Sequence, residues 1–336
     1  MSELISIIIP AYNAEKSIQQ TLNSVLAQTH NNIEIIVIND ASTDNTLNEL
    51  QEYAIKDPRI KVINLEENQG VHEARMHGLR ASTGQWIGFV DADDYIHPEM
   101  YQAMLSDVLN YNADIGMCSV KRVNEQGKLI RYAPKFRKNQ VVNSNLLENL
   151  TQFKLGAAYL SNRLYSRDVI IDIVDKKFPW RQSLNEDLVI NIGCFIKANR
   201  IVLNEQAFYS YVDNGASATA TVNKEKAYVE HFKAFVLALK FYGHFPNEAQ
   251  ELIYDVYRTQ FAYPTMHVEK VGKLQKFDKE LLVALKVAQD KDPLALVKLA
   301  SRNSKTCSSF IQRLFRVARK VLSKFVFKDK EFEFIK

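Results

Sequence analysis

Cysteine is scarce in this chain, and long hydrophobic runs are absent from it. The 336 residues include three cysteines, Cys118, Cys194 and Cys307, with no C-x-x-C pair. This spacing excludes a disulfide framework and a cysteine-based zinc site, and it suits a reducing compartment. No stretch reaches the roughly 18 apolar residues of a membrane-spanning helix. Because the first apolar run has no basic segment before it and stops at Pro10, we expect no signal peptide and a cytoplasmic protein.

Internal repeats and low-complexity tracts are also absent. Apolar residues make up 46% of the chain and charged residues 24%, which is ordinary for a soluble globular protein and excludes disorder, collagen and coiled coil as overall classes. At about 150 residues per domain, the length predicts about two domains.

Positive charge is concentrated near the C-terminal end. The formal net charge is +4, but residues 301–328 contain eight Lys and Arg and no acid, whereas residues 1–300 sum to −3. A nucleic-acid-binding protein would be more uniformly basic, so we expect no nucleic-acid partner. Residues 310–327 combine an apolar helical face with a basic one. This pattern favours peripheral contact with an anionic membrane over a helix packed on its own domain, which stays the alternative.

Strand and helix signals alternate over the first hundred residues. Continuous apolar runs predict buried parallel strands, and apolar residues at helical spacing predict helices between them. The predicted strands are 5–9, 33–38, 60–65 and 85–90, and the predicted helices are 17–28, 43–55 and 71–81. This alternation predicts an α/β fold with a doubly wound, mostly parallel, Rossmann-like sheet. Ligands bind at the carboxyl ends of such strands.

The pattern changes twice along the chain. After residue 105 it becomes mixed α+β, with a predicted hairpin formed by 115–123 and 126–132, and from about Lys224 it is almost entirely helical. We therefore expect boundaries that divide the chain into 1–105, 106–223 and 224–336.

Three carboxylates, Asp91, Asp93 and Asp94, follow the predicted strand at 85–90. Carboxylates this close repel one another unless a cation or hydrogen-bond donors hold them. Hard oxygen ligands suit magnesium or manganese, with substrate phosphates completing the coordination. A solvated acidic turn is the alternative, but the apolar strand before the aspartates places them at the mouth of the core and favours the metal site.

Other polar residues follow neighbouring strands. Asp40 can accept a hydrogen bond from a base or a ribose hydroxyl, if Ser42 or Thr43 caps the next helix. Tyr12 suits equally a cover for a nucleotide base and a packed rim aromatic. Arg75 can pair with an anionic ligand, although exposed arginines on helices are usually solvated.

Glu186 and Asp187 precede the apolar run of a later helix. An acid there can act as a general base that takes a proton from an attacking hydroxyl. Acids are also favoured in the first turn of any helix, and the residues by themselves favour this second interpretation.

Taken in order, these motifs resemble those of family 2 glycosyltransferases with the GT-A fold. The matching segments run over about the first 220 residues, and the later ones are similar to the acceptor half of capsule and lipooligosaccharide transferases. They are Pro10–Asn13, 33–46, Asn68–Gly70, Ala74–Arg75, 89–98, Asn162–Tyr165, Phe178–Pro179, Glu186–Asp187 and Phe208–Tyr211.

The resemblance implies a role for each matching residue. It implies a nucleotide-binding set of Pro10, Ala11, Tyr12, Asn13, Asp40, Arg75, Asp91 and Ala92, a metal pair of Asp93 and Asp91, and a catalytic pair of Asp187 and Glu186. Asp93 would be the direct metal ligand, and Asp187 the general base. Residues 1–105 would then bind the nucleotide sugar and residues 106–223 the acceptor.

The implied activity is an inverting, metal-dependent transfer of a hexose or N-acetylhexosamine to a bacterial surface glycan. The donor would be a nucleotide sugar, usually UDP-linked, and the basic segment 301–328 suits a lipid-linked acceptor. Two departures from the family pattern stand out. Asn39 replaces a frequent aspartate, and no basic residue follows Tyr211 in the segment up to Gly215.

Three other functions compete with this one. A sugar nucleotidyltransferase should have a glycine-rich loop after the first strand, but no glycine occurs before Gly70. A non-catalytic sugar-binding protein would not need both the DxD pair and Glu186–Asp187. A phosphoacceptor signalling domain would not need the residues that follow the first hundred.

Overall fold

The computed structural model of the chain describes residues 3–214, 224–245, 247–262, 278–292 and 295. The chain separates into two compact units, 1–221 and 222–336; we expected the helical region to begin at residue 224. The predicted basic helix over 310–327 lies outside the described residues.

One mixed sheet runs through the first unit, with strand order β3-β2-β1-β4-β9-β6-β10-β5, while β7 pairs with β6 and β8 with β10. Its strands are β1 (Ile5–Ala11), β2 (Ile33–Asn39), β3 (Ile60–Asn64), β4 (Trp86–Phe89), β5 (Tyr95–Ile96), β6 (Ile115–Asn124), β7 (Leu129–Tyr132), β8 (Gln140–Val142), β9 (Arg163–Ser166) and β10 (Ile201–Asp213). The pairs β1–β2, β2–β3, β1–β4 and β6–β10 are parallel. The predicted mostly parallel, doubly wound sheet is confirmed.

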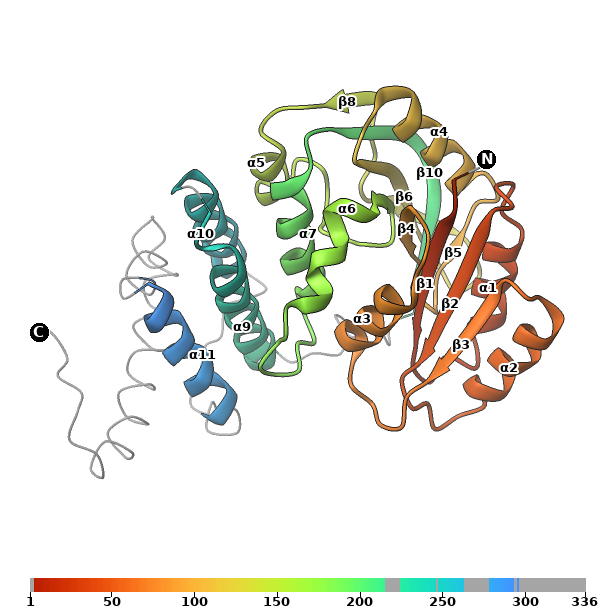
Figure 1. Ribbon diagram of the computed structural model, residues 1–336, viewed down its shortest axis with the longest axis horizontal. Helices are drawn as coiled ribbons and strands as arrows, with labels where there is room; N and C mark the ends of the chain where they lie inside the picture. The colour runs from red at the N-terminus through yellow and green to blue at the C-terminus, as the bar shows by residue number, and fades with distance from the viewer. Residues whose placement is uncertain (1–2, 215–223, 246, 263–277, 293–294, 296–336) are drawn as a thin grey trace, which may run out of the picture. The chain divides into compact units, whose positions relative to one another are not determined.

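The three helices predicted over the first hundred residues are present as α1, α2 and α3, and further helices follow them. The helices of the first unit are α1 (Ile18–Leu26), α2 (Thr46–Lys56), α3 (Val71–Ala81), α4 (Met100–Tyr111), α5 (Leu146–Thr151), α6 (Arg167–Ile170), the 3-10 helix η1 (Ile171–Asp175) and α7 (Glu186–Lys197). Figure 1 shows α1 and α2 on one side of β1–β3 and α3 on the other.

The apolar run of β1 is continuous because helices cover both of its faces. Ile7 and Ile9 belong to a buried cluster with Leu22 of α1. On the other face, Ile8 lies against Gly78 of α3, where a Cβ atom would come within 2.4 Å of Ile8 Cγ2. The missing side chain of Gly78 therefore lets α3 approach the sheet closely.

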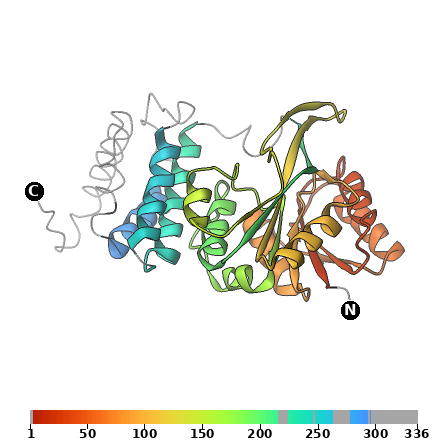
Figure 2. The same ribbon diagram turned by 90° about the horizontal axis from the view of Figure 1, so that it is seen from above.

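The second half of the first unit extends the same sheet. β9 lies between β4 and β6 and is antiparallel to both. We predicted the β6–β7 hairpin, and it is present, but we predicted no strand at β9. Residue 105, an expected boundary, lies within α4, and the sheet is continuous from the red and orange strands to the green one (Figure 2).

Hydrogen bonds join the loops at the carboxyl ends of β1 and β2. The backbone N–H of Asn13 donates to Ser42 Oγ at 3.0 Å, and the N–H of Thr43 donates to Asn13 Oδ1 at 2.8 Å. Asn13 has a φ of 49°, a left-handed conformation that asparagine tolerates better than most residues. These contacts fix the edge of the sheet where ligands bind in α/β folds.

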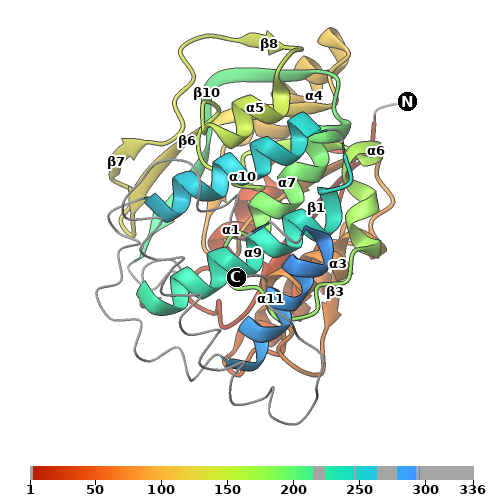
Figure 3. The same cartoon turned by 90° about the vertical axis from the view of Figure 1, so that its left-hand side faces the viewer.

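The described part of the second unit is helical. It contains α9 (Lys224–Tyr242), α10 (Asn247–Ala262) and α11 (Asp278–Lys291), and α9 contacts both of the others (Figure 3). The ring of Phe235 packs against Tyr254 and Tyr257 at centroid distances of 5.4 and 5.5 Å. Across the described ranges, no helix combines the length and the apolar character needed to cross a membrane.

Candidate active site

The aspartate-rich loop after β4 is anchored by its last residue. Asp94 is buried, and its two carboxylate oxygens accept hydrogen bonds from Tyr209 Oη at 2.6 Å and from the N–H of Val212 at 2.8 Å. The Tyr209 oxygen also accepts a bond from the N–H of Asp91 at 3.2 Å. Asp94 thus ties the loop to β10 and fixes where Asp91 and Asp93 lie.

Asp93 and Asp91 occupy different electrostatic surroundings. Burial and the nearby charge of Asp91 raise the pKa of Asp93 above its ordinary value, although Asn214 Nδ2 donates to Asp93 Oδ2 at 3.1 Å and opposes this effect. Asp91 Oδ1 accepts a hydrogen bond from Arg75 at 2.9 Å. A positive charge placed beside the Asp93 carboxylate would therefore relieve an unfavourable interaction.

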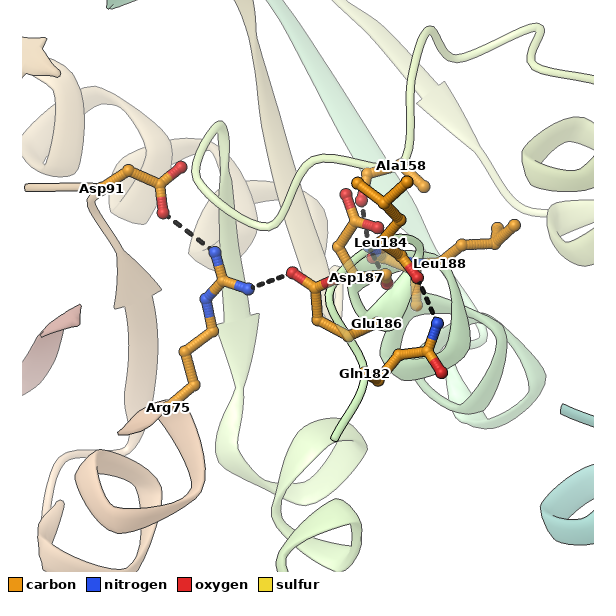
Figure 4. A network of polar contacts seen from close by, with 9 residues as sticks. Arg75, Asp91, Ala158, Gln182, Leu184, Glu186, Asp187 and Leu188 are labelled. Atoms are coloured by element: carbon orange, nitrogen blue, oxygen red, sulfur yellow. Dashed lines mark hydrogen bonds and ion pairs between the residues drawn. The ribbon is translucent and has the colours of Figure 1, made fainter. Parts of the chain in front are cut away.

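Arg75 connects this loop to the start of α7. Its guanidinium is buried and donates to Asp91 Oδ1 and to Glu186 Oε1, each at 2.9 Å (Figure 4). Burial lowers the pKa of Arg75, but Asp91 and Glu186 more than offset this and raise it overall. Within the part of the chain that the structure describes, its Nε atom has no hydrogen-bond partner.

Asp187 lies next to Glu186 in the first turn of α7. Burial and the charge of Glu186 raise the pKa of Asp187 to about 7, while Arg75 and the N–H of Leu188, which donates to Asp187 Oδ1 at 2.7 Å, oppose the increase. A carboxylate with a pKa near neutrality can accept a proton and release it again at physiological pH. The α7 helix begins after Asn185, which has a φ of 62°. Asparagine is among the residues that adopt this left-handed conformation.

Asp40 follows strand β2, as expected, but its carboxylate is held by a neighbouring loop. Its carboxylate does not project freely from the strand end; it accepts hydrogen bonds from the N–H groups of Gln69 at 2.7 Å and Gly70 at 2.8 Å, at the start of α3. Only 2% of Asp40 is exposed. The cause is local, because a carboxylate satisfies the unpaired N–H groups that precede a helix. The expected cap at Ser42 or Thr43 is also absent, since α2 begins only at Thr46.

The remaining residues of the expected nucleotide-binding set differ in accessibility. Pro10 and Ala11 are buried within β1, and Ala92 is buried with its carbonyl accepting bonds from Ser17 and Thr21. Tyr12 is half exposed, and Asn13 is exposed. Tyr12 and Asn13 are therefore the members of this group whose side chains can reach a ligand.

Comparisons with known proteins agree with this geometry. The family model described as Glycosyl transferase family 2 matches residues 6–174. The chain is 31% identical to the glycosyltransferase EpsJ of Bacillus subtilis, over 73% of this chain and 71% of that protein. It is 28% identical to the glycosyltransferase YibD of Escherichia coli, over 79% and 78%.

The chain belongs to glycosyl transferase family 2.

A solved relative has the same fold as this family 2 glycosyltransferase. The crystal structure of residues 1–349 of Staphylococcus aureus TarS, in complex with UDP-GlcNAc, superposes with a TM-score of 0.69 at 21% identity and covers 99% of this chain and 94% of that one. The expected GT-A fold is therefore confirmed.

We expected Asp91 and Asp93 to form the metal pair of this family 2 glycosyltransferase. The described residues contain no group of three or more His, Cys, Asp or Glu side chains that could hold a metal ion by themselves. Mg²⁺ in nucleotide enzymes is usually bound by one or two carboxylates and completed by substrate phosphates and water. The two aspartates, one of them in a site that penalises its negative charge, fit such a shared site.

Three features of the site were missed from the sequence. Asp94 serves as the anchor of the loop, Asn214 contacts Asp93, and Arg122 lies over the ring of Tyr211 at 4.9 Å while pairing with Asp213 at 2.7 Å. We noted that no basic residue follows Tyr211 in sequence. Arg122, on the neighbouring strand β6, places a cation beside that segment, and the parallel pairing of β6 with β10 was the signal that could have located it.

Proposed function

We propose that this chain is an inverting, metal-dependent glycosyltransferase that moves a hexose or N-acetylhexosamine from a UDP-sugar to a hydroxyl group of a bacterial surface glycan. One observation carries the proposal. Arg75 links the DxD loop to the Glu186–Asp187 pair through two hydrogen bonds of 2.9 Å. The residues suited to hold a diphosphate and the residue suited to act as a base therefore belong to one connected site.

The relatives support the choice of donor and acceptor. TarS was crystallised with UDP-GlcNAc, and its name describes a poly(ribitol-phosphate) beta-N-acetylglucosaminyltransferase. This chain is 31% identical to TarS over 61% of its length. A UDP-linked N-acetylhexosamine is accordingly the first donor to test.

The expected reaction is a single displacement. Asp187 takes the proton from the acceptor hydroxyl, the oxygen attacks the anomeric carbon, and the bond from that carbon to the diphosphate oxygen breaks on the opposite face. The configuration inverts because one displacement occurs and no second nucleophile takes part. A divalent cation, held by Asp93 and Asp91 when bound, would supply positive charge to the departing diphosphate.

The other site residues have supporting roles in this proposal. Tyr12, which is half exposed at the end of β1, would cover the base of the nucleotide. Asp40 would act through the loop it orders at Gln69 and Gly70. Arg75 would hold Asp91 and Glu186 in their relative positions. Peripheral contact of 301–328 with an anionic membrane stays a proposal from sequence, tested by liposome binding after deletion of 301–336.

Nucleotide release tests the proposed function. UDP-, GDP-, CMP- and dTDP-sugars are offered with manganese and with EDTA, and released nucleotide is measured. We expect slow, metal-dependent release from one or two UDP-sugars. No release from any donor, together with no metal-dependent nucleotide binding, would support a non-catalytic sugar-binding protein. Pyrophosphate release from a nucleoside triphosphate and a sugar phosphate would support a nucleotidyltransferase.

A further inference from the structure

Residues 1–300 have a net charge of −3, but one segment among them forms a strongly basic surface. Residues 121–138, which comprise the end of β6, strand β7 and the segment after it, contain seven Lys and Arg and one Glu, a net charge of +6. Most of their side chains are exposed. The basic residues are Lys121, Arg122, Lys128, Arg131, Lys135, Arg137 and Lys138. In Figure 3 the β6–β7 hairpin lies at the side of the sheet.

Two arginines of this surface stand directly opposite each other. Arg122 on β6 and Arg131 on β7 are register partners in an antiparallel pair, and a bulge follows immediately. Residues directly opposite share one face, and like charges in this position destabilise a hairpin. Asp213 pairs with Arg122 at 2.7 Å, but Arg131 forms no ion pair with any carboxylate in the described ranges. One positive charge of the pair is therefore left uncompensated there.

The Arg122–Arg131 pair lies near two stacked tyrosine rings. Arg122 covers the ring of Tyr211, which stacks on Tyr159 with a centroid distance of 6.0 Å. Burial, Tyr211 and Asp187 raise the pKa of Tyr159, whereas Arg122 and Arg131 lower it. Both arginines and Asp187 thus lie close enough to Tyr159 for their charges to act on its hydroxyl group.

Protection of an edge strand does not account for this arrangement. Charged residues on an edge strand prevent pairing with other chains, which would explain only Arg131 on β7 and Lys128 just before it. However, the same strand exposes Leu129 and Ile130, at 45% and 53%, which would favour such pairing. Edge protection also gives no reason to place Arg122 opposite Arg131.

We propose that the acceptor carries a phosphate group, and that Arg122 and Arg131 bind this phosphate beside the Tyr159–Tyr211 pair. A guanidinium group matches phosphate oxygens with two parallel hydrogen bonds. A phosphate between the two arginines removes their repulsion, and the two tyrosine rings offer an aromatic surface to the adjoining sugar or polyol. This inference rests on the proposed function, because it names the chemistry of the acceptor for that same site.

Binding of a defined phosphate probe tests the inference without donor or turnover. A fluorescently labelled glycerol-phosphate oligomer is titrated with the full chain and followed by anisotropy. Arg131→Gln and Arg131→Lys are compared with wild type and with Lys61→Gln, an exposed charge on the distant edge strand β3. We expect Arg131→Gln to weaken binding about tenfold or more, the size of a lost charge-assisted hydrogen bond. Arg131→Lys should restore binding in part, and Lys61→Gln should leave it within about twofold, since a single surface charge contributes little.

A second arm distinguishes the source of the phosphate. Vesicles containing phosphatidylglycerol replace the oligomer, and an uncharged dextran oligomer is the negative control. Arg131-dependent binding to the oligomer points to a phosphate polymer, and Arg131-dependent binding to vesicles points to a lipid carrier. Equal binding by wild type and Arg131→Gln, equal binding to dextran, or no binding of either phosphate probe would overturn the inference. Wild-type nucleotide release is measured separately, so the proposed function and this inference can fail independently.

Discussion

Arg75 and Glu186 lie 111 residues apart in the sequence and form a buried ion pair at 2.9 Å. The same guanidinium holds Asp91 at the same distance. Helix α3 is thereby fastened to the first turn of α7, where Asp187 lies. The positions that we propose for the donor and for the base are consequently coupled through a single side chain.

Removal of Arg75 should lower the stability of the protein. Arg75→Ala leaves the buried Glu186 without its partner, and loss of one member of a buried pair typically lowers the free energy of unfolding by about 3–5 kcal/mol. Arg75→Lys keeps the charge but loses the planar fork that reaches two carboxylates. Urea unfolding measures the effect. Arg80→Ala, on the exposed side of the same helix, is the control and should cost less than about 1 kcal/mol. Equal losses for both variants would contradict the role assigned to Arg75.

The pH dependence of turnover should report Asp187. A general base must be deprotonated, and burial together with Glu186 raises the pKa of Asp187 to about 7. We therefore expect kcat/KM to rise with pH through about 7 and then level off, as measured from pH 5 to pH 9. The rising limb should disappear in the residual activity of Asp187→Asn. A profile that is flat across this range, or the same limb in the variant, would refute the assignment.

The same group should make stability fall as pH rises. An aspartate in an unfolded chain has a pKa of about 3.9, whereas in the folded protein that of Asp187 is about 7. Between these values the folded state binds a proton that the unfolded state has released, so the free energy of unfolding decreases with increasing pH. Asp187→Asn removes this cost. The melting temperature of Asp187→Asn minus that of wild type should be larger at pH 8 than at pH 5. For Asp290→Asn, at an exposed site, this difference should be the same at both pH values.

Asn214 should influence how tightly the metal is held. Its side chain donates to Asp93 Oδ2, and a hydrogen-bonded partner of a metal ligand typically changes metal affinity by about 10–100-fold. We expect Asn214→Ala to need about tenfold more manganese for half-maximal nucleotide release. Asn48→Ala, on α2, is the control. An unchanged manganese requirement in Asn214→Ala would count against the placement of the metal at Asp93.

The sequence was sufficient for the parallel strands of the first hundred residues and for the loops that follow them. β1, β2 and β4 are continuous apolar runs because the sheet is covered on both faces, and polar residues at their ends mark the ligand-binding edge. Local order of this kind can be predicted, because it depends on neighbours in the chain.

Contacts between distant segments could not be predicted in this way. The Arg75–Glu186 pair depends on how α3 and the start of α7 pack, and the position of Asp40 depends on the loop at Gln69. The facing arginines of β6 and β7 depend on a register that a bulge fixes. A charge count in short windows would have found the basic hairpin, but not the site beside which it lies.

Nucleotide binding measured by calorimetry tests whether Asp93 and Asp187 serve opposite ends of one site. UDP is titrated into wild type, Asp93→Ala and Asp187→Ala with manganese and with EDTA, and sugar-nucleotide turnover is measured on the same preparations. We predict that Asp93→Ala loses manganese-dependent UDP binding, whereas Asp187→Ala keeps it and loses turnover. Manganese-dependent UDP binding by Asp93→Ala at wild-type strength, or full turnover by Asp187→Ala, would contradict these roles of Asp93 and Asp187.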